Sequence, residues 1–236
     1  MIKNNKLLIS ATLPFIIAEL TLGVLLQVIP GRTSALISFV VVVLACLFCV
    51  LFTERSISYI FTQIALVCTV FADYFLVYSE EMMQLPAMIL FSVTQICYFL
   101  RLYFEDADGK RKKLHLVCRI FLSLAAITLT LAVLGKNSDA VAVVSMFYYA
   151  NLILNTVFAF IGFKKNPLFA IGLLLFILCD TVVGLSMIDG YLPVSQDSLI
   201  YKMTHPEFNL AWVFYVPSQT LLSISLLPKR LNKNSH

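Results

Sequence analysis

Long apolar runs separated by short polar segments dominate the chain. Each run is close to the roughly 20 residues that an α-helix needs to cross the hydrocarbon core of a bilayer. We therefore predict an all-α membrane protein in which residues 1–236 form a single polytopic transmembrane domain. The pattern predicts a bundle of about eight transmembrane helices, at residues 7–29, 34–52, 57–78, 85–104, 115–134, 139–161, 168–188 and 209–227.

Composition supports this fold class and narrows the function. Hydrophobic residues make up 60% of the chain and charged residues only 13%, whereas about 25% of the residues of soluble domains are charged. The net charge of +4 therefore does not indicate nucleic-acid binding. The six cysteines fall in or beside apolar spans, where we expect small buried side chains. None of the three histidines is central in a span, which argues against a histidine-bound metal in the membrane. We expect no metal and no cofactor.

The distribution of basic residues predicts the orientation of the helices. Eight spans place both termini on one side of the membrane. That side holds fourteen of the seventeen lysines and arginines, and the other side holds Arg32, Lys136 and Lys202. Cytoplasmic loops carry the excess of basic residues, so we predict cytoplasmic N- and C-termini and a location in the plasma membrane. The run Lys110–Lys113 is most simply part of this signal, and binding of anionic lipid head groups is the alternative.

Three carboxyl groups interrupt the apolar spans, at Glu19, Asp73 and Asp180. A carboxylate inside a membrane span costs about 2.5–3.5 kcal/mol on insertion scales, so it normally faces other protein groups or a cavity. Asp73 and Asp180 lie past the middle of spans that run outward, and Gln95 reaches a similar depth from a returning span. We therefore expect these groups to gather in the middle to outer half of the bilayer.

Three spans carry polar stripes at helical spacing. The positions are Ser92, Gln95 and Tyr98; Tyr148, Asn151 and Asn155; and Trp212, Tyr215, Gln219 and Ser223. Such stripes either form interhelical hydrogen bonds, worth about 0.6 kcal/mol each, or line a shared polar cavity. A further hypothesis is two parallel four-helix repeats, because a span with Asp is followed by one with Thr-Gln or Ser-Gln in each half.

The longest external loop, residues 189–208, shows no helical periodicity. Its prolines and aromatic residues suit a lid over a polar cavity, and they suit a simple connector equally well. We expect a connector.

The same polar residues carry a resemblance to the YhhN-like membrane proteins, whose characterised members are lysoplasmalogenases. The matching motifs follow the family's order and are Ala72-Asp73, Phe75-Leu76, Phe91-x-x-Thr94-Gln95-x-x-Tyr98, Tyr148, Gly172, Phe176, Cys179-Asp180 and Tyr215-x-x-x-Gln219. The resemblance covers essentially the whole chain. Two positions depart from the family pattern, since Gln95 replaces a histidine and Asn155 replaces a methionine.

The resemblance implies a hydrolase acting on ether bonds, which cleaves the vinyl ether of a lysoplasmalogen to a fatty aldehyde and a glycerophospho-alcohol. Protonation of the outer alkenyl carbon gives an oxocarbenium ion that water attacks, and glycosidases handle a similar ion with paired carboxyl groups. Asp73 and Asp180 suit the acid and base roles by residue type and depth. The candidate substrate-binding residues are Glu19, Gln95, Tyr98, Tyr148, Asn151, Tyr215 and Gln219.

A different class of function suits the same scaffold. Paired intramembrane acids also occur in proton-coupled transporters, so a non-catalytic lipid-binding or transport protein is the alternative. Replacement of the histidine points to weak, altered or absent hydrolysis, because glutamine hydrogen-bonds but does not titrate. Under both hypotheses the partners are a lysoplasmalogen-like lipid and the bilayer, and no nucleic acid.

Overall fold

The computed structural model describes residues 5–53, 56–79, 82–192, 195, 197–198, 201 and 208–227. Within these residues the chain is all-helical, which confirms the predicted fold class. The α-helices are α1 (Asn5–Val28), α2 (Arg32–Phe52), α3 (Ile57–Asp73), α4 (Gln84–Glu105), α5 (Gly109–Leu134), α6 (Ala140–Ile161), α7 (Pro167–Ser186) and α9 (Leu210–Ile224). Short helical turns follow three of them, namely η1 (Tyr74–Tyr78), η2 (Gly135–Asn137) and η3 (Ile188–Gly190).

Seven of these helices are long and apolar enough to cross a membrane, as expected of a multi-pass membrane protein. The last helix differs from the prediction, which placed a span at residues 209–227. Helix α9 has 15 residues, about 22 Å of length, whereas the hydrocarbon core is about 30 Å thick. The final predicted span is therefore a shorter helix that packs inside the bundle.

Polar caps explain where several helices begin. The capping residues are Ser56 for α3, Asp108 for α5, Asp139 for α6 and Asn166 for α7. Each side chain accepts a hydrogen bond from a main-chain N–H of the first turn, which the helix itself leaves without a partner. The polar residues that separate the apolar runs thus set the lengths of the spans.

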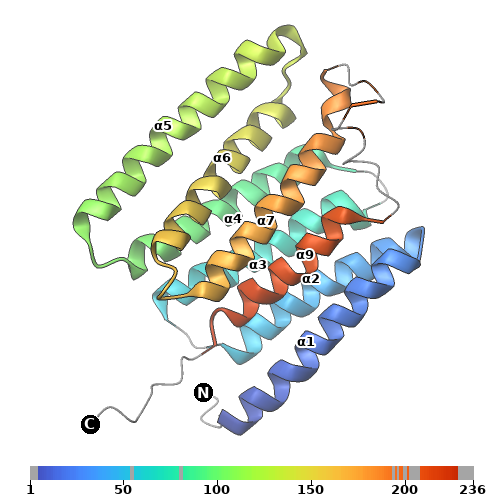
Figure 1. Ribbon diagram of the computed structural model, residues 1–236, viewed down its shortest axis with the longest axis vertical. Coiled ribbons are helices and arrows are strands. Elements are labelled where there is room, and N and C mark those ends of the chain that lie inside the picture. Colours follow the sequence, from blue (N-terminus) through green and yellow to red (C-terminus); the bar gives the residue numbers. More distant parts are fainter. Residues whose placement is uncertain are drawn as a thin grey trace.

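The helices form two layers, with one further helix at each edge (Figure 1). In this view α6, α7 and α9 lie in front of α4, α3 and α2, while α5 and α1 occupy opposite edges. Helix α3 packs along α4, α7 packs along α9, and α6 contacts both α4 and α7. The start of α1 and the end of α9 lie at the same end of the bundle (Figure 1). The hypothesis of two parallel repeats stays a prediction.

The core lies between the two layers. Gly172 allows α7 to approach α9 closely, because a Cβ at this position would lie 3.0 Å from Cγ of Leu222. The edge helix α5 instead turns large apolar side chains outward, with Val117 62% and Phe121 72% exposed. A broad exposed apolar face marks an interaction surface, and on a membrane protein this surface faces lipid.

The start of the loop 189–208 is held against α6. The hydroxyl of Tyr191 donates to both carboxylate oxygens of Asp139, at 3.1 and 3.2 Å. Partial burial and the neighbouring Asp139 raise the pKa of Tyr191. Much of the remaining loop lies outside the described residues, so its role as lid or connector stays a prediction.

Candidate functional site

Asp73 and Asp180 each accept a hydrogen bond from a tyrosine on another helix. The hydroxyl of Tyr215 on α9 donates to Oδ2 of Asp73 at 2.6 Å. The hydroxyl of Tyr148 on α6 donates to Oδ2 of Asp180. Four helices therefore contribute to the two acid–tyrosine pairs. A hydroxyl donor stabilises a carboxylate that would otherwise be isolated in an apolar environment.

The aspartates lie near one another inside the bundle. Their carboxyl groups are close enough to interact electrostatically, and Tyr148 interacts electrostatically with both. Coulomb interactions act more strongly in such a low-dielectric interior than in water. The structure thus brings together both predicted catalytic residues and two of the predicted binding residues, Tyr148 and Tyr215.

Contacting aromatic rings link the two tyrosines of the acid–tyrosine pairs. The ring of Phe176 lies 5.5 Å from that of Tyr215, and the ring of Phe91 lies 5.5 Å from that of Tyr148. Phe91 and Phe176 contact each other edge to face at 6.1 Å. Apolar ring surface therefore lies directly beside the polar groups of both pairs.

The local fold at Asp73 is unusual. Asp73 is the last residue of α3, and the next turn, Tyr74–Tyr78, is π-helical. A π-helical turn is wider than an α-helical one and occurs frequently at functional sites. The turn changes the direction of the side chains that follow Asp73, so the carboxyl group lies at a break in the regular helix.

Gln95 belongs to a different polar cluster. Nδ2 of Asn155 donates to Oε1 of Gln95 at 3.0 Å and to its main-chain oxygen at 2.8 Å. Arg119 on α5 donates to Oδ1 of Asn155 at 2.5 Å and also to Oδ1 of Asn151. Gln95 and Asn155, the two positions noted in the sequence as departures from the resemblance, are therefore hydrogen-bonded to each other. Asn151 shares this cluster and not the acid–tyrosine pairs.

Arg119 is a buried cation at the centre of this cluster. Its side chain is 8% exposed, its guanidinium lies 4.2 Å from the ring centroid of Phe99, and Nη2 lies 3.4 Å from Nε2 of His115. Among the described residues no carboxylate forms an ion pair with it. Amide oxygens and an aromatic face thus replace a counter-ion.

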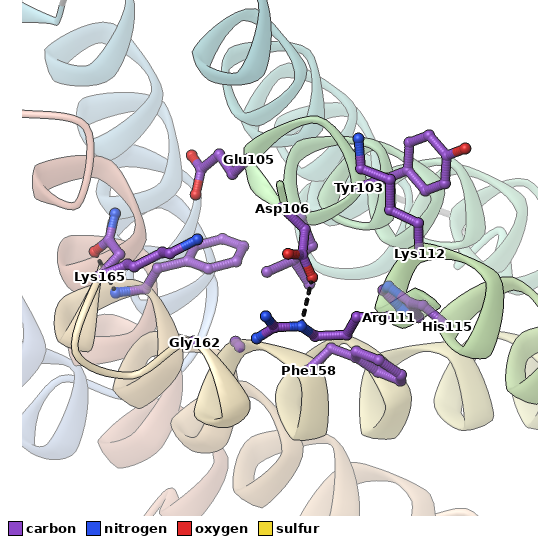
Figure 2. Close-up of a pocket in the computed structure, with 13 residues that line it drawn as sticks. Tyr103, Glu105, Asp106, Arg111, Lys112, His115, Phe158, Gly162 and Lys165 are labelled. Carbon is purple, nitrogen blue, oxygen red and sulfur yellow. Dashed lines mark hydrogen bonds and ion pairs between the residues drawn. The ribbon is translucent and has the colours of Figure 1, made fainter. Parts of the chain in front are cut away.

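A pocket opens at the end of the bundle where α4 ends and α5 begins (Figure 2). Its lining includes Arg111, Lys112 and His115 from α5 and Lys165 after α6. His115 is also the residue that contacts Arg119, so the Arg119 cluster adjoins the pocket. Neither Asp73 nor Asp180 lines this pocket.

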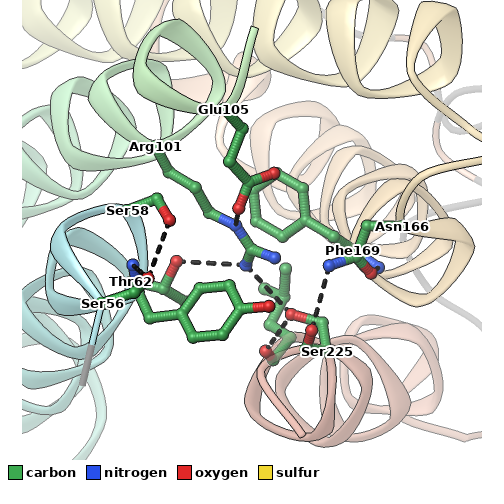
Figure 3. Close-up of polar contacts among 10 residues, drawn as sticks. Ser56, Ser58, Thr62, Arg101, Glu105, Asn166, Phe169 and Ser225 are labelled. Atoms are coloured by element: carbon green, nitrogen blue, oxygen red, sulfur yellow. Dashed lines mark hydrogen bonds and ion pairs between the residues drawn. The ribbon is translucent and has the colours of Figure 1, made fainter. Parts of the chain in front are cut away.

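A second buried arginine, Arg101, lies near the same end of the bundle (Figure 3). It is fully buried, and its Nε donates to Glu105 at 3.1 Å. Nη1 donates to the hydroxyls of Thr62 at 3.1 Å and Ser225 at 3.0 Å, and the guanidinium lies 3.9 Å from the ring centroid of Phe169. This cluster joins α3, α4, α7 and the end of α9.

Tyr98 lies beside the Arg101 cluster. It is fully buried, its ring contacts Phe169 edge to face at 5.5 Å, and it interacts electrostatically with Arg101. Its hydroxyl has no hydrogen-bond partner within the described part of the chain. Of the predicted binding residues, Tyr98 is therefore the one associated with Arg101.

Gln219 and Glu19 are buried, and within the described part of the chain neither side chain has a hydrogen bond of normal geometry. Both side-chain polar atoms of Gln219, one turn after Tyr215, lack a partner among the described residues. Both carboxyl oxygens of Glu19 on α1 likewise lack a bond of normal geometry, although the side chain lies near Thr220 of α9. Close packing of Gly23 on Val216 places α1 directly against α9 at this point.

The burial of Arg101 and Arg119 was not predicted. Both were expected in the loops that set topology, but their side chains lie inside the bundle. Removing them leaves twelve basic residues on the predicted cytoplasmic side against three, so the asymmetry persists. The sequence does contain an indication that Arg119 is buried, because His115, Arg119 and Ser123 follow at four-residue steps along one face of α5.

The comparison with known families identifies the chain. The model of the YhhN family matches residues 33–226, which is most of the sequence and includes both acid–tyrosine pairs. The chain therefore belongs to the YhhN family, and the resemblance noted in the sequence is confirmed. No curated protein and no solved structure matches the chain. Helix α1, which carries Glu19, lies before the matched residues.

Proposed function

We propose that this member of the YhhN family hydrolyses the vinyl ether bond of lysoplasmalogens, releasing a fatty aldehyde and a glycerophospho-alcohol. The observation that carries the proposal is the pair of interacting carboxyl groups, Asp73 and Asp180, each held by a tyrosine hydroxyl within apolar surroundings. The reaction needs a proton donor and a carboxylate in the same place, and this arrangement can supply both.

The chemistry balances with water as the only co-reactant. A carboxyl group gives its proton to the outer alkenyl carbon, and the ether oxygen donates electrons to form an oxocarbenium ion. Water adds to the cationic carbon and loses a proton to the second carboxylate. The resulting hemiacetal collapses to the aldehyde and the alcohol. Burial disfavours the charge on a carboxyl group, and two neighbouring carboxyl groups do not readily both ionise, so such a pair tends to hold one proton.

We assign different roles to the two acids because their exposure differs. Asp73 is 4% exposed, whereas Asp180 is partly exposed. Asp180 is therefore the acid that meets the substrate first, and Asp73 acts from the interior side. Tyr148 and Tyr215 hold the carboxyl groups in place and can donate to the water or to the glycerol hydroxyls as the charges change.

The remaining predicted binding residues have less direct roles in this proposal. Gln95 and Asn151 are engaged with Asn155 and Arg119, and Tyr98 is associated with Arg101. We assign them to the support of helices α4 and α6. Gln219, one turn from Tyr215, is the further candidate for a contact with substrate, because its amide is not committed to another described group.

An assay of aldehyde release from the purified protein tests the proposal. We expect aldehyde from a lysoplasmalogen and none from an ordinary acyl lysophospholipid, which has an ester in place of the vinyl ether. An assay in reconstituted vesicles distinguishes hydrolysis from transport, since a transporter would move intact lipid across the bilayer without releasing aldehyde. That second result would replace the hydrolase by a transport protein.

A further inference from the structure

A small pocket lies at the basic end of the bundle, apart from the two aspartates. It is formed where α4 ends, α5 begins, α6 ends and α7 begins. The cavity volume of about 40 Å³ is the space of roughly three water molecules. This size suits a small polar group and excludes a lipid chain.

The pocket has more positive than negative charge in its walls. Arg111, Lys112 and Lys165 line it, against the acids Glu105 and Asp106 (Figure 2). Oδ2 of Asp106 lies 3.0 Å from Nε of Arg111, so the charges of these two residues neutralise each other. Among the described residues, no carboxylate forms an ion pair with Lys112 or Lys165.

The buried guanidinium groups of Arg101 and Arg119 lie next to the pocket and add to this positive charge. Glu105, the second acid of the pocket, is bound by Arg101, which also stacks on the pocket residue Phe169. Arg119 contacts the pocket residue His115 and has no carboxylate partner among the described residues. Nη2 of Arg101 and Nε of Arg119 are buried without a hydrogen-bond partner in the described structure. The acids present therefore do not neutralise the cations around the pocket.

We infer that this pocket binds the phosphate group of an anionic phospholipid. Basic pockets between transmembrane helices bind anionic head groups because lysine and arginine supply charged donors to phosphate oxygens. Lys112 and Lys165 are the direct phosphate ligands, and Arg101 and Arg119 supply a positive field behind them. Exposed apolar side chains next to the pocket, Leu114 and Phe163, offer a surface along which the acyl chains lie.

This lipid is not the proposed substrate. Phe158 at the pocket and Tyr148 beside Asp180 lie ten residues apart on α6, which is about 15 Å along the helix axis. In a lysoplasmalogen the phosphate and the vinyl ether are attached to the same glycerol unit, so one molecule does not reach both positions. The inference therefore goes beyond the proposed hydrolysis and stands or fails independently of it.

The run Lys110–Lys113 supplies a matched control. Arg111 and Lys112 line the pocket, whereas Lys110 and Lys113 are exposed and do not. Lys164 similarly neighbours Lys165 without lining the pocket. The test variant is Lys112→Gln/Lys165→Gln, and the control is Lys113→Gln/Lys164→Gln, which removes the same charge from the adjacent positions.

Binding of phosphatidylglycerol to the purified full chain in detergent, counted by native mass spectrometry, tests the inference. We expect the parent and the control to bind one phosphatidylglycerol in preference to phosphatidylcholine. The Lys112→Gln/Lys165→Gln variant is expected to bind it roughly tenfold or more weakly, because each basic residue near an anionic head group contributes measurably. Lys112→Arg/Lys165→Arg retains the charge and should restore binding.

Two results would overturn the inference. Equal weakening in the test and control variants would mean that attraction to the basic end is diffuse and that no pocket selects the lipid. Saturation of the site by inorganic phosphate at the same concentrations would assign the pocket to a soluble anion instead of a phospholipid. Helical circular dichroism of every variant confirms that the comparison is made between folded proteins.

Discussion

The two acid–tyrosine pairs have the same chemistry but different surroundings. Asp73 and Asp180 each accept a hydroxyl hydrogen bond, and the two tyrosines are buried to the same degree, with Tyr215 4% and Tyr148 5% exposed. The two aspartate residues differ in exposure, because Asp73 is 4% exposed and Asp180 is partly exposed. Access, and not the hydrogen-bond donor, therefore distinguishes the two acids.

The difference follows from the helices that carry the two acids. Asp73 ends α3, which packs along α4 and contacts α9 in the interior of the bundle. Asp180 lies in the second half of α7, and α7 has large exposed apolar side chains such as Leu178 on either side of the buried face. One accessible and one buried carboxyl group suit the proposed reaction, in which one acid donates a proton to the substrate and the other carboxylate accepts a proton from water.

The largest expected effect is the loss of either carboxyl group. Asp73→Asn and Asp180→Asn are each expected to lower vinyl ether hydrolysis by about 10²–10⁴-fold, the usual contribution of general acid–base catalysis. Asparagine keeps the size and most of the hydrogen bonding of aspartate but cannot donate the proton. Aldehyde release by folded variants is the measurement. Full activity in both would make the aspartates structural.

Substitution of the two tyrosines should change the free energy of unfolding by different amounts. Tyr215→Phe leaves a buried carboxyl group without its donor, which we expect to cost about 1–3 kcal/mol of unfolding free energy. Tyr148→Phe should cost less, because Asp180 is more exposed than Asp73. Denaturation of the two variants in the same detergent measures the difference. An equal loss would show that exposure does not distinguish the pairs.

Chemical labelling reads the difference in access directly. An apolar carbodiimide reacts with protonated carboxyl groups in membranes, so it should modify Asp180 several-fold faster than Asp73. Mass spectrometry of digested protein at short times gives both rates in one sample, and Asp180→Asn serves as the control for peptide assignment. Faster labelling of Asp73 would reverse the proposed order of access.

A smaller effect is expected at Gln95. Gln95→His introduces the histidine that the sequence resemblance leads us to expect, and it adds a titratable group one turn from Phe91, which contacts Tyr148. We expect a few-fold increase in aldehyde release, or its appearance if the parent shows none. Asn155→Met alone is the control, since it removes the hydrogen bond to Gln95 without adding a titratable group. No gain with Gln95→His would place Gln95 outside the catalytic path.

The fold was largely predictable because membrane insertion constrains the sequence so strongly. Seven of the predicted spans correspond to helices of spanning length, and the polar residues between them act as caps. Helix α9 was harder to predict, since apolar residues continue past Ile224 into a turn that closes on α7, where Asn166 donates to the main-chain oxygen of Ser225. A tertiary contact of that kind leaves no periodic signal.

The site was predictable in its residue types and less so in its partners. Helical spacing correctly put Tyr215 and Gln219 on one face, but it did not indicate that Tyr215 meets Asp73 while Tyr148 meets Asp180. The pairing of Gln95 with Asn155, and of both with Arg119, depends on how α4, α5 and α6 pack. Arg101 and Arg119 looked like loop residues because a charge near the end of a span usually marks topology.

Hydrolysis in heavy water tests the central claim, that the proton from the aspartate pair cleaves the vinyl ether. Protonation of the outer alkenyl carbon places one solvent-derived hydrogen on the carbon next to the aldehyde. In D₂O, with the aldehyde trapped as it forms, the account predicts a full-length aldehyde carrying one deuterium at that carbon, and almost none from Asp73→Asn or Asp180→Asn. An aldehyde without deuterium, a chain shortened by one carbon, or unchanged release by both variants would contradict it.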